Sequence, residues 1–209
     1  IKTIKDAWLK EWMPKLKSDE VPINPYRVIW DLMHTIDREK AIVTHDSGSP
    51  RDQSIPFYES ISPRGFIGWG KSTQLGYSLG LAMGAKMAAP EKLAVNIIGD
   101  YGFGMIGMDI ETAVRENIPV LTIILNMATI VIYWPSSFPT ADDLYGTKST
   151  TGDYAKVAEA LGGYNERVKR PHEIAAAILR AQRVVANGQS AVLEFITSEE
   201  RAFSFRNPV

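Results

Sequence analysis

Asp100 and Asn126 are the residues of this chain whose types and spacing most directly suggest chemistry. Asp100 closely follows the apolar run 93–98, and Asn126, 26 residues further along, follows the apolar run 120–125. If the two runs are neighbouring strands of a parallel sheet, the carboxylate and the carboxamide meet at one edge, where their oxygens can hold a hard cation. Nearby glycines let backbone N–H groups approach a phosphate. The segment therefore predicts a site for a divalent cation and a diphosphate.

The rest of the chain supplies the elements that must position these residues. Apolar periodicity predicts helices over 2–17, 25–36, 73–88, 105–117, 154–161 and 172–186, and strands over 41–44, 65–69, 93–98, 120–125, 164–168 and 191–196. The stretches 45–63 and 127–151 are predicted as loops. Strands that alternate with helices predict an α/β fold, a parallel sheet of about six strands with helices on both faces. Its carboxyl strand ends would place Asp46 and Ser47 beside Asp100 and Asn126.

Composition limits the class of protein. The chain has 209 residues, of which 45% are hydrophobic and 22% charged, which is ordinary for one globular domain. A net charge of −1 gives no sign of nucleic acid or an anionic membrane as a partner. No apolar run reaches the roughly 18 residues that span a bilayer. The absence of cysteine excludes disulfides and thiolate chemistry and fits a reducing compartment, so we predict a cytoplasmic protein.

The motif Gly99-Asp100-Tyr101-Gly102, followed by the strand that ends at Asn126, resembles the signature of thiamine diphosphate-dependent enzymes. Three further segments resemble its usual surroundings: 46–49, 69–85 and 115–120. The resemblance covers roughly residues 20–200. It points to the C-terminal diphosphate-binding domain of the acetolactate synthase, benzoylformate decarboxylase and oxalyl-CoA decarboxylase group. It implies a lyase or carboligase that acts on a 2-oxo acid or a 2-hydroxyacyl thioester, with thiamine diphosphate and Mg²⁺ as cofactors.

The resemblance assigns metal and cofactor roles to named positions. Asp100 and Asn126 would bind Mg²⁺ together with a backbone carbonyl at Ala128 or Thr129. The full cofactor-binding set that it implies is Ser47, Ser49, Thr73, Leu75, Gly99, Asp100, Tyr101, Gly102, Asn126 and Ile132.

Two of these positions are carried over as catalytic. Leu75 aligns with the bulky residue that lies under the cofactor and forces its bent shape, and Ile132 aligns with a residue on the substrate side. The carbonyl of Thr73 would accept a hydrogen bond from the pyrimidine amine of the cofactor. The plain interpretation of Leu75 is an ordinary core residue.

Two positions depart from the family pattern. Tyr101 replaces a glycine, so its side chain either crowds the phosphate or bonds to it through the hydroxyl. Met127 replaces a second Asn and offers only a thioether, a poor ligand for a hard ion. Either Asn126, a backbone carbonyl or water then serves as the metal ligand in its place, or the metal site is lost. The alternative hypothesis is therefore a degenerate, cofactor-free domain with a structural or regulatory role, and a third is a domain for another phosphorylated ligand.

The resemblance also implies partners. In the related enzymes a Glu from a pyrimidine-binding domain activates the cofactor, and the active site lies between subunits. We expect a pyrimidine-binding domain or subunit of the same enzyme, a homo-oligomer (dimer or tetramer) and a small-molecule substrate. Residues 1–20 would be a linker helix from a preceding domain, 21–200 the thiamine diphosphate-binding domain and 201–209 a tail. Ile1 is not an initiator Met, so we expect a fragment of a longer polypeptide, with a natural separate subunit as the alternative.

Overall fold

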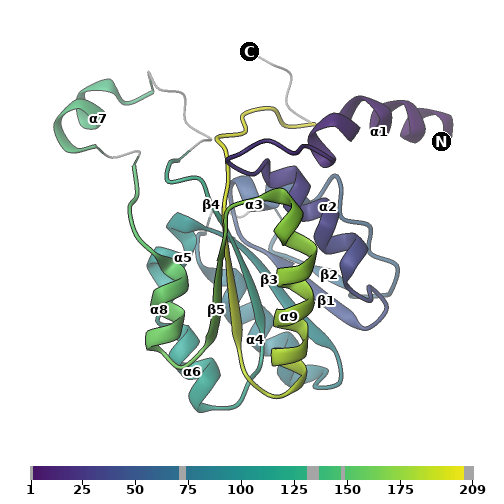
Figure 1. Cartoon of the computed structure of the whole chain (residues 1–209), viewed down its shortest axis with the longest axis vertical. Helices are drawn as coiled ribbons and strands as arrows, with labels where there is room; N and C mark the ends of the chain where they lie inside the picture. The colour runs from purple at the N-terminus through teal and green to yellow at the C-terminus, as the bar shows by residue number, and fades with distance from the viewer. Residues whose placement is uncertain (1, 71–73, 131–136, 147–148, 205–209) are drawn as a thin grey trace.

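The computed structural model describes residues 2–70, 74–130, 137–146 and 149–204. Its α-helices are α1 (Lys2–Leu16), α2 (Pro25–Thr35), α3 (Ser49–Ser54), α4 (Tyr77–Ala88), α5 (Asp100–Ile106), α6 (Asp109–Arg115), α7 (Pro139–Tyr145), α8 (Tyr154–Ala160) and α9 (Ile174–Ala186), with a short 3₁₀ turn η1 (Pro171–Glu173) before α9 (Figure 1). Its strands are β1 (Ala41–His45), β2 (Phe66–Ile67), β3 (Leu93–Gly99), β4 (Leu121–Asn126), β5 (Tyr164–Val168) and β6 (Ala191–Ile196).

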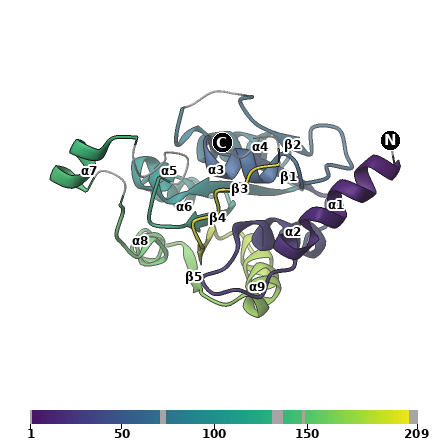
Figure 2. The same cartoon turned by 90° about the horizontal axis from the view of Figure 1, so that it is seen from above.

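The strands form one six-stranded sheet in the order β2-β1-β3-β4-β6-β5, and every neighbouring pair is parallel. β3 is central: Ile97 pairs with His45 of β1 on one side and with Ile123 of β4 on the other. Helices cover both faces of the sheet, as the view from above shows (Figure 2). The predicted α/β fold with a parallel sheet of about six strands is confirmed. Since β3 and β4 are adjacent and parallel, Asp100 and Asn126 leave the sheet at the same edge.

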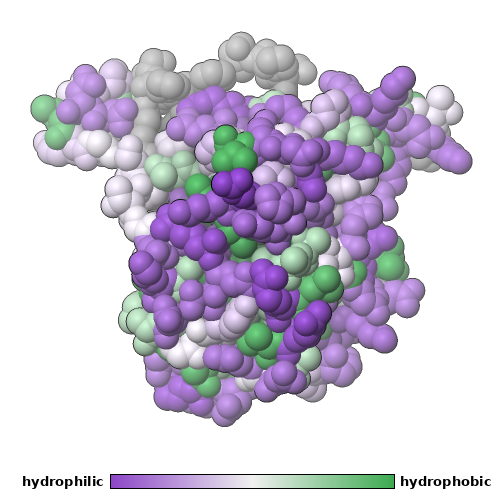
Figure 3. All heavy atoms as spheres, viewed as in Figure 1, coloured by the Kyte–Doolittle hydropathy of each residue, from purple (hydrophilic) through white to green (hydrophobic). Residues whose placement is uncertain are grey.

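Two apolar cores lie on opposite faces of the sheet. Ile123 packs in the core that contains the buried residues of α2 and α9, whereas its neighbour Ile124 packs in the core under α4, α5 and α6. A strand buried on both faces needs apolar residues without alternation, which explains the continuous run of β4. The outer face seen in Figure 3 is mainly hydrophilic. Among the described helices, none has both the length and the apolar character that crossing a bilayer requires.

The structure corrects several predicted element boundaries. The helix predicted over 105–117 is two helices, and the first begins at Asp100. Glycines at 102 and 104 have low helix propensity, so the sequence pattern hid this first turn. The helix predicted from residue 73 begins at Tyr77, because Gly76 has a φ of +87° and ends the preceding loop.

Two predicted loops contain short helices. The 45–63 stretch includes α3, and the 127–151 stretch includes α7. Each has a proline in its first turn, where the missing N–H costs nothing. Neither helix is long enough to show a clear apolar period, so periodicity does not predict them.

The two ends of the described chain pack on the same side of the domain. Trp8 of α1 stacks on Phe57 with 4.9 Å between ring centroids, and Trp12 meets Tyr26 edge-on at 5.2 Å. The Tyr26 hydroxyl donates to the carbonyl of Ala202 at 2.7 Å. The N-terminal helix and the chain after β6 are therefore attached to the domain, and the role of α1 as a linker stays a prediction.

Candidate diphosphate and metal site

Asp100 starts α5 at the carboxyl end of β3, and its residue is only 3% exposed. Its Oδ1 accepts from the Tyr101 N–H at 2.9 Å. Its Oδ2 accepts from the Ala128 N–H at 2.7 Å and from the Thr150 hydroxyl at 3.2 Å. Burial raises the pKa of the Asp100 carboxyl, and these hydrogen bonds oppose the rise. Thr150 was not predicted from the sequence, because it comes from a segment without periodicity.

Asn126 ends β4 and lies beside Asp100. Its amide Nδ2 donates to Glu194 Oε1 at 2.7 Å, and its Oδ1 accepts from the Ala128 N–H at 3.0 Å. Oxygens from both strand ends thus lie within 3.0 Å of one backbone nitrogen. The structure brings together the two residues that the spacing singles out, and their roles as ligands remain for the proposal below.

Glu194 orients the Asn126 amide from β6. The residue is 0% exposed, its Oε2 accepts from the Ala155 N–H at 3.0 Å, and Arg167 Nε lies 3.7 Å from the same oxygen. A buried carboxylate requires such partners. Because an ionised carboxylate only accepts hydrogen bonds, it holds the amide nitrogen of Asn126 on its own side and leaves the amide oxygen toward the Asp100 side. A single acidic residue inside a strand buried on both faces was the sequence signal for this contact.

Asp46 anchors the other half of the site at the end of β1. The residue is 0% exposed, and both carboxylate oxygens lie 3.0 Å from the Gly76 N–H nitrogen at the start of α4. Its Oδ2 also occupies the space beside Gly102, where an added Cβ would come within 2.1 Å of it. An added Cβ on Gly99 would lie 3.5 Å from Pro50 of α3. The β1 loop, the start of α4 and the Gly99–Gly102 turn therefore meet.

The remaining predicted residues have different outcomes. Both predicted serines are buried next to this junction, Ser47 in the loop that follows β1 and Ser49 at the first residue of α3. Leu75 is half-buried and directly precedes Gly76. Thr73 and Ile132 lie outside the described residues, so their predicted roles stay predictions.

Tyr101 and Met127, which depart from the family pattern, take up different environments. Tyr101 is partly buried, and burial together with the negative charge of Asp100 raises the pKa of its phenol. Met127 is buried and belongs to neither of the two apolar cores. After it, Ala128 has a φ of +57° and accepts from the Thr150 N–H at 3.0 Å, while Thr129 pairs with Ser149. The chain thus turns sharply after Met127 and pairs with the 149–150 segment.

The donor atoms at this edge fit a hard cation. A buried carboxylate, a carboxamide oxygen, a hydroxyl and backbone carbonyls are all oxygen donors of the kind that Mg²⁺ prefers. Within the described ranges, no group of three or more His, Asp or Glu side chains forms a metal cluster. A cation here would therefore rely on one carboxylate and on neutral oxygens, with a diphosphate supplying further negative charge.

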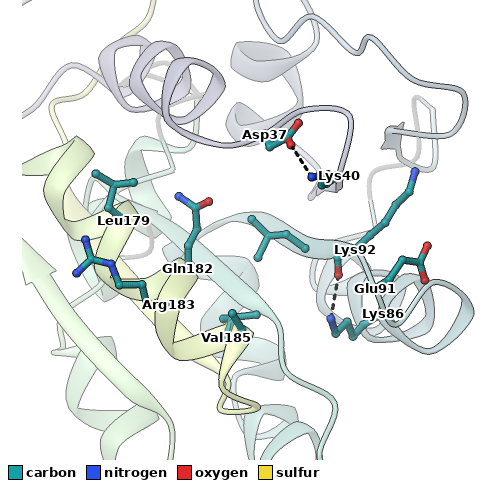
Figure 4. Close-up of a pocket in the computed structure, with 11 residues that line it drawn as sticks. Asp37, Lys40, Lys86, Glu91, Lys92, Leu179, Gln182, Arg183 and Val185 are labelled. Carbon is teal, nitrogen blue, oxygen red and sulfur yellow. Dashed lines mark hydrogen bonds and ion pairs between the residues drawn. The ribbon is translucent and has the colours of Figure 1, made fainter.

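One cavity lies away from this edge of the sheet. It has a volume of about 420 Å³ and lies between α9 and the turns that precede β1 and β3, at the amino-terminal edge of the sheet (Figure 4). Lys40 faces Asp37 at 3.7 Å, and Lys86 donates to the carbonyl of Lys92 at 2.9 Å. These cations are already partnered, and the cavity is on the edge opposite Asp100, so we do not assign it to the site.

A parallel α/β sheet that gathers oxygen donors and glycines at the carboxyl ends of its central strands defines a diphosphate-binding class of domain. Residues 46–195 match the family described as thiamine pyrophosphate enzyme, C-terminal TPP binding domain, and the chain belongs to this family. Thiamine diphosphate is the cofactor that this domain family binds.

Relatives of the chain are similar over most of its length. It is 28% identical to a probable acetolactate synthase large subunit of Methanococcus aeolicus, over 95% of this chain and 34% of that protein. It is 30% identical to an acetolactate synthase large subunit of Mycobacterium tuberculosis, over 92% of this chain and 35% of that protein. It is also 30% identical to a 2-hydroxyacyl-CoA lyase of Arabidopsis thaliana, over 78% of this chain and 30% of that protein. The chain spans about a third of the length of these relatives.

If Asp100 has the metal role that the sequence predicts, cation binding should depend on pH. The pKa of Asp100 is raised above the ordinary value of 3.8, and a proton and a cation compete for the same carboxylate. Protonation therefore begins at a higher pH than for an exposed Asp, and affinity for Mg²⁺ should fall as the pH is lowered, approaching tenfold per pH unit below the pKa. Titrating Mn²⁺ at a series of pH values from about 8 to about 5 measures this. Constant affinity across a range in which the protein stays folded would contradict it.

Proposed function

We propose that this chain holds the diphosphate and the Mg²⁺ of a thiamine diphosphate-dependent lyase or carboligase. The observation that carries the proposal is the meeting of Asp100 and Asn126 oxygens at the Ala128 nitrogen, beside the glycine turn of the family signature. The names of the relatives, acetolactate synthase and 2-hydroxyacyl-CoA lyase, support a 2-oxo acid or a 2-hydroxyacyl thioester as the substrate class. A cytoplasmic location stays a prediction.

The proposed cation ligands are Asp100, Asn126 Oδ1 and a backbone carbonyl. Because the Ala128 carbonyl already accepts from Thr150, we favour the Thr129 carbonyl as the third protein ligand. Glu194 holds the Asn126 oxygen in place. Ser47, Ser49 and the N–H groups of the Gly99–Gly102 turn would bind the diphosphate, because the turn approaches the β1 loop closely.

Bound thiamine diphosphate supplies an electron sink for cleaving or forming a carbon–carbon bond next to a carbonyl. The residues of this chain bind and orient it. We propose that Leu75 supports the bent cofactor from its place before Gly76, and that Thr73 and Ile132 have the contacts that the family pattern assigns to them. The Glu that activates the pyrimidine would come from a different domain or chain.

A partner domain would cover the face of α4. Gly80 and Gly84 are open on this face, with no atom within 4 Å of an added Cβ. Met87 of the same helix and Met105 of α5 are exposed. We propose that a pyrimidine-binding domain or subunit covers this area in a homo-oligomer. The relatives are about three times the length of this chain, which leaves room for such a domain.

Calorimetric titration with thiamine diphosphate tests the proposal. We expect binding that requires Mg²⁺ and is abolished by chelation, while thiamine without its diphosphate binds at least tenfold more weakly. The alternative, a cofactor-free domain, is motivated by Tyr101 and Met127 and by the internal hydrogen bonds that already satisfy Asp100. It predicts no heat of binding under any of these conditions, including after the chain is assembled with a pyrimidine-binding domain.

A further inference from the structure

Thr150 is fixed over the carboxylate of Asp100 by its own backbone. Its N–H donates to the Ala128 carbonyl at 3.0 Å, and the preceding residue, Ser149, pairs with Thr129. This pairing holds Thr150 beside the chain that leaves β4. Its hydroxyl then reaches Asp100 Oδ2 at 3.2 Å. Thr150 is half-buried, so the contact is partly shielded from water.

The two donors to Asp100 Oδ2 differ in what they can do when a cation arrives. The Ala128 N–H is part of the main chain and cannot become an acceptor. A threonine hydroxyl has one rotatable proton and two lone pairs, so it can turn its proton away and present oxygen to the cation. Thr150 is thus the side chain beside Asp100 that can change from donor to ligand without moving the backbone.

The Thr150 oxygen is needed as a cation ligand because the neighbouring positions offer few other oxygens. Met127 is buried and provides only a thioether. Asn126 supplies a single oxygen, Oδ1, which also accepts from the Ala128 N–H, because Glu194 holds its amide nitrogen on the other side. The Ala128 carbonyl is engaged by Thr150 itself.

We propose that the Thr150 hydroxyl is a ligand of the divalent cation that binds at Asp100. The proposal rests on the proposed function, because it needs a cation at Asp100. It adds to that site a residue that lies 50 positions along the chain from Asp100 and outside the signature motif.

Replacing the hydroxyl tests the proposal on the purified chain. Mn²⁺ affinity is measured by electron paramagnetic resonance, with Mg²⁺ as competitor and thiamine diphosphate present. We expect Thr150→Val to weaken cation binding about tenfold, which is about 1.4 kcal/mol, and Thr150→Ser to bind like the parent. Thr151→Val, at the exposed neighbouring residue, is the matched control and should leave affinity unchanged. Unfolding without metal is measured in parallel.

A sulfur substitution separates coordination from simple positioning. The chain has no cysteine, so Thr150→Cys introduces a single thiol. A coordinating thiol lowers affinity for Mg²⁺ and raises affinity for Cd²⁺, with the ultraviolet absorption of a Cd²⁺–thiolate bond. Thr151→Cys should show neither change, and adding Asp100→Asn should remove the gain in Cd²⁺ affinity.

The outcomes separate this inference from the function on which it rests. If Asp100→Asn abolishes cation binding while Thr150→Val and Thr150→Cys behave like their Thr151 controls, Thr150 is not a ligand and the proposed function stands. If Thr150→Val only lowers stability and the affinity stays at the parent level, its role is structural. If Asp100→Asn changes nothing, both proposals are wrong.

Discussion

Asp100→Asn is expected to weaken Mg²⁺-dependent binding of thiamine diphosphate at least a hundredfold, about 2.7 kcal/mol. The substitution keeps the size of the side chain and removes its charge. The N–H groups of Tyr101 and Ala128 now donate to the two carboxylate oxygens, and the new amide NH₂ would face one of these N–H groups. The cation therefore loses its anionic ligand, and one of these backbone N–H groups loses its acceptor at the side chain. Calorimetric titration measures the affinity, and circular dichroism confirms that the fold is retained.

Asp109→Asn is the matched control for this substitution. Asp109 is exposed in the first turn of α6, in the same crossover, and it should bind the cofactor like the parent. Asp100→Asn is preferred to Asp100→Ala because alanine would remove the carboxylate that now accepts from three donors. A folded Asp100→Asn protein with parental affinity would remove Asp100 from the cation site.

Gly102→Ala is expected to destabilise the fold by about 3 kcal/mol. The added Cβ would lie 2.1 Å from Asp46 Oδ2 and 3.0 Å from Ile98 Cγ1. Asp46 has no room to move aside, because it is fully buried and both of its oxygens bind the Gly76 N–H. Chemical denaturation measures the change in the free energy of unfolding, and thiamine diphosphate affinity should fall with it.

Gly104→Ala provides the control in the same helix. An added Cβ at Gly104 meets nothing within 4 Å, so alanine should stabilise the protein by about 0.5–1 kcal/mol through helix propensity. The cause of the Gly102 effect is tested by combining Gly102→Ala with Asp46→Ala. Removing the carboxylate should make Gly102→Ala much less costly, a coupling that a double-mutant cycle detects. Equal costs in the two backgrounds would show that Asp46 is not the source of the clash.

The sheet was predictable because its signals are local. Each central strand is an uninterrupted apolar run, and the runs alternate with helical periods, so a parallel sheet covered on both faces was the consistent solution. The short helices α3, α5 and α7 were not predictable. α3 and α7 are short and have a proline in the first turn, and α5 begins with a glycine-rich turn that argues against a helix.

The residues of the candidate site were likewise only partly predictable from the sequence. Asp100 and Asn126 were found because each directly follows a predicted strand. Thr150 and Glu194 were missed as members of the site, because they come from a segment without periodicity and from the middle of the last strand. Only folding brings them to the Asp100 edge, where Thr150 contacts Asp100 and Glu194 contacts Asn126.

The sequence by itself determined the order of the six strands along the chain, the edge at which the functional residues gather and the two departures from the family signature, Tyr101 and Met127. The tertiary structure decided which way the side chains at that edge point. It placed the Asn126 oxygen by means of Glu194, made Gly102 necessary by burying Asp46 against it, and brought Thr150 to Asp100. The physical reason is that periodicity records which residues are buried, whereas hydrogen-bond partners distant in sequence are chosen only when the chain has closed around them.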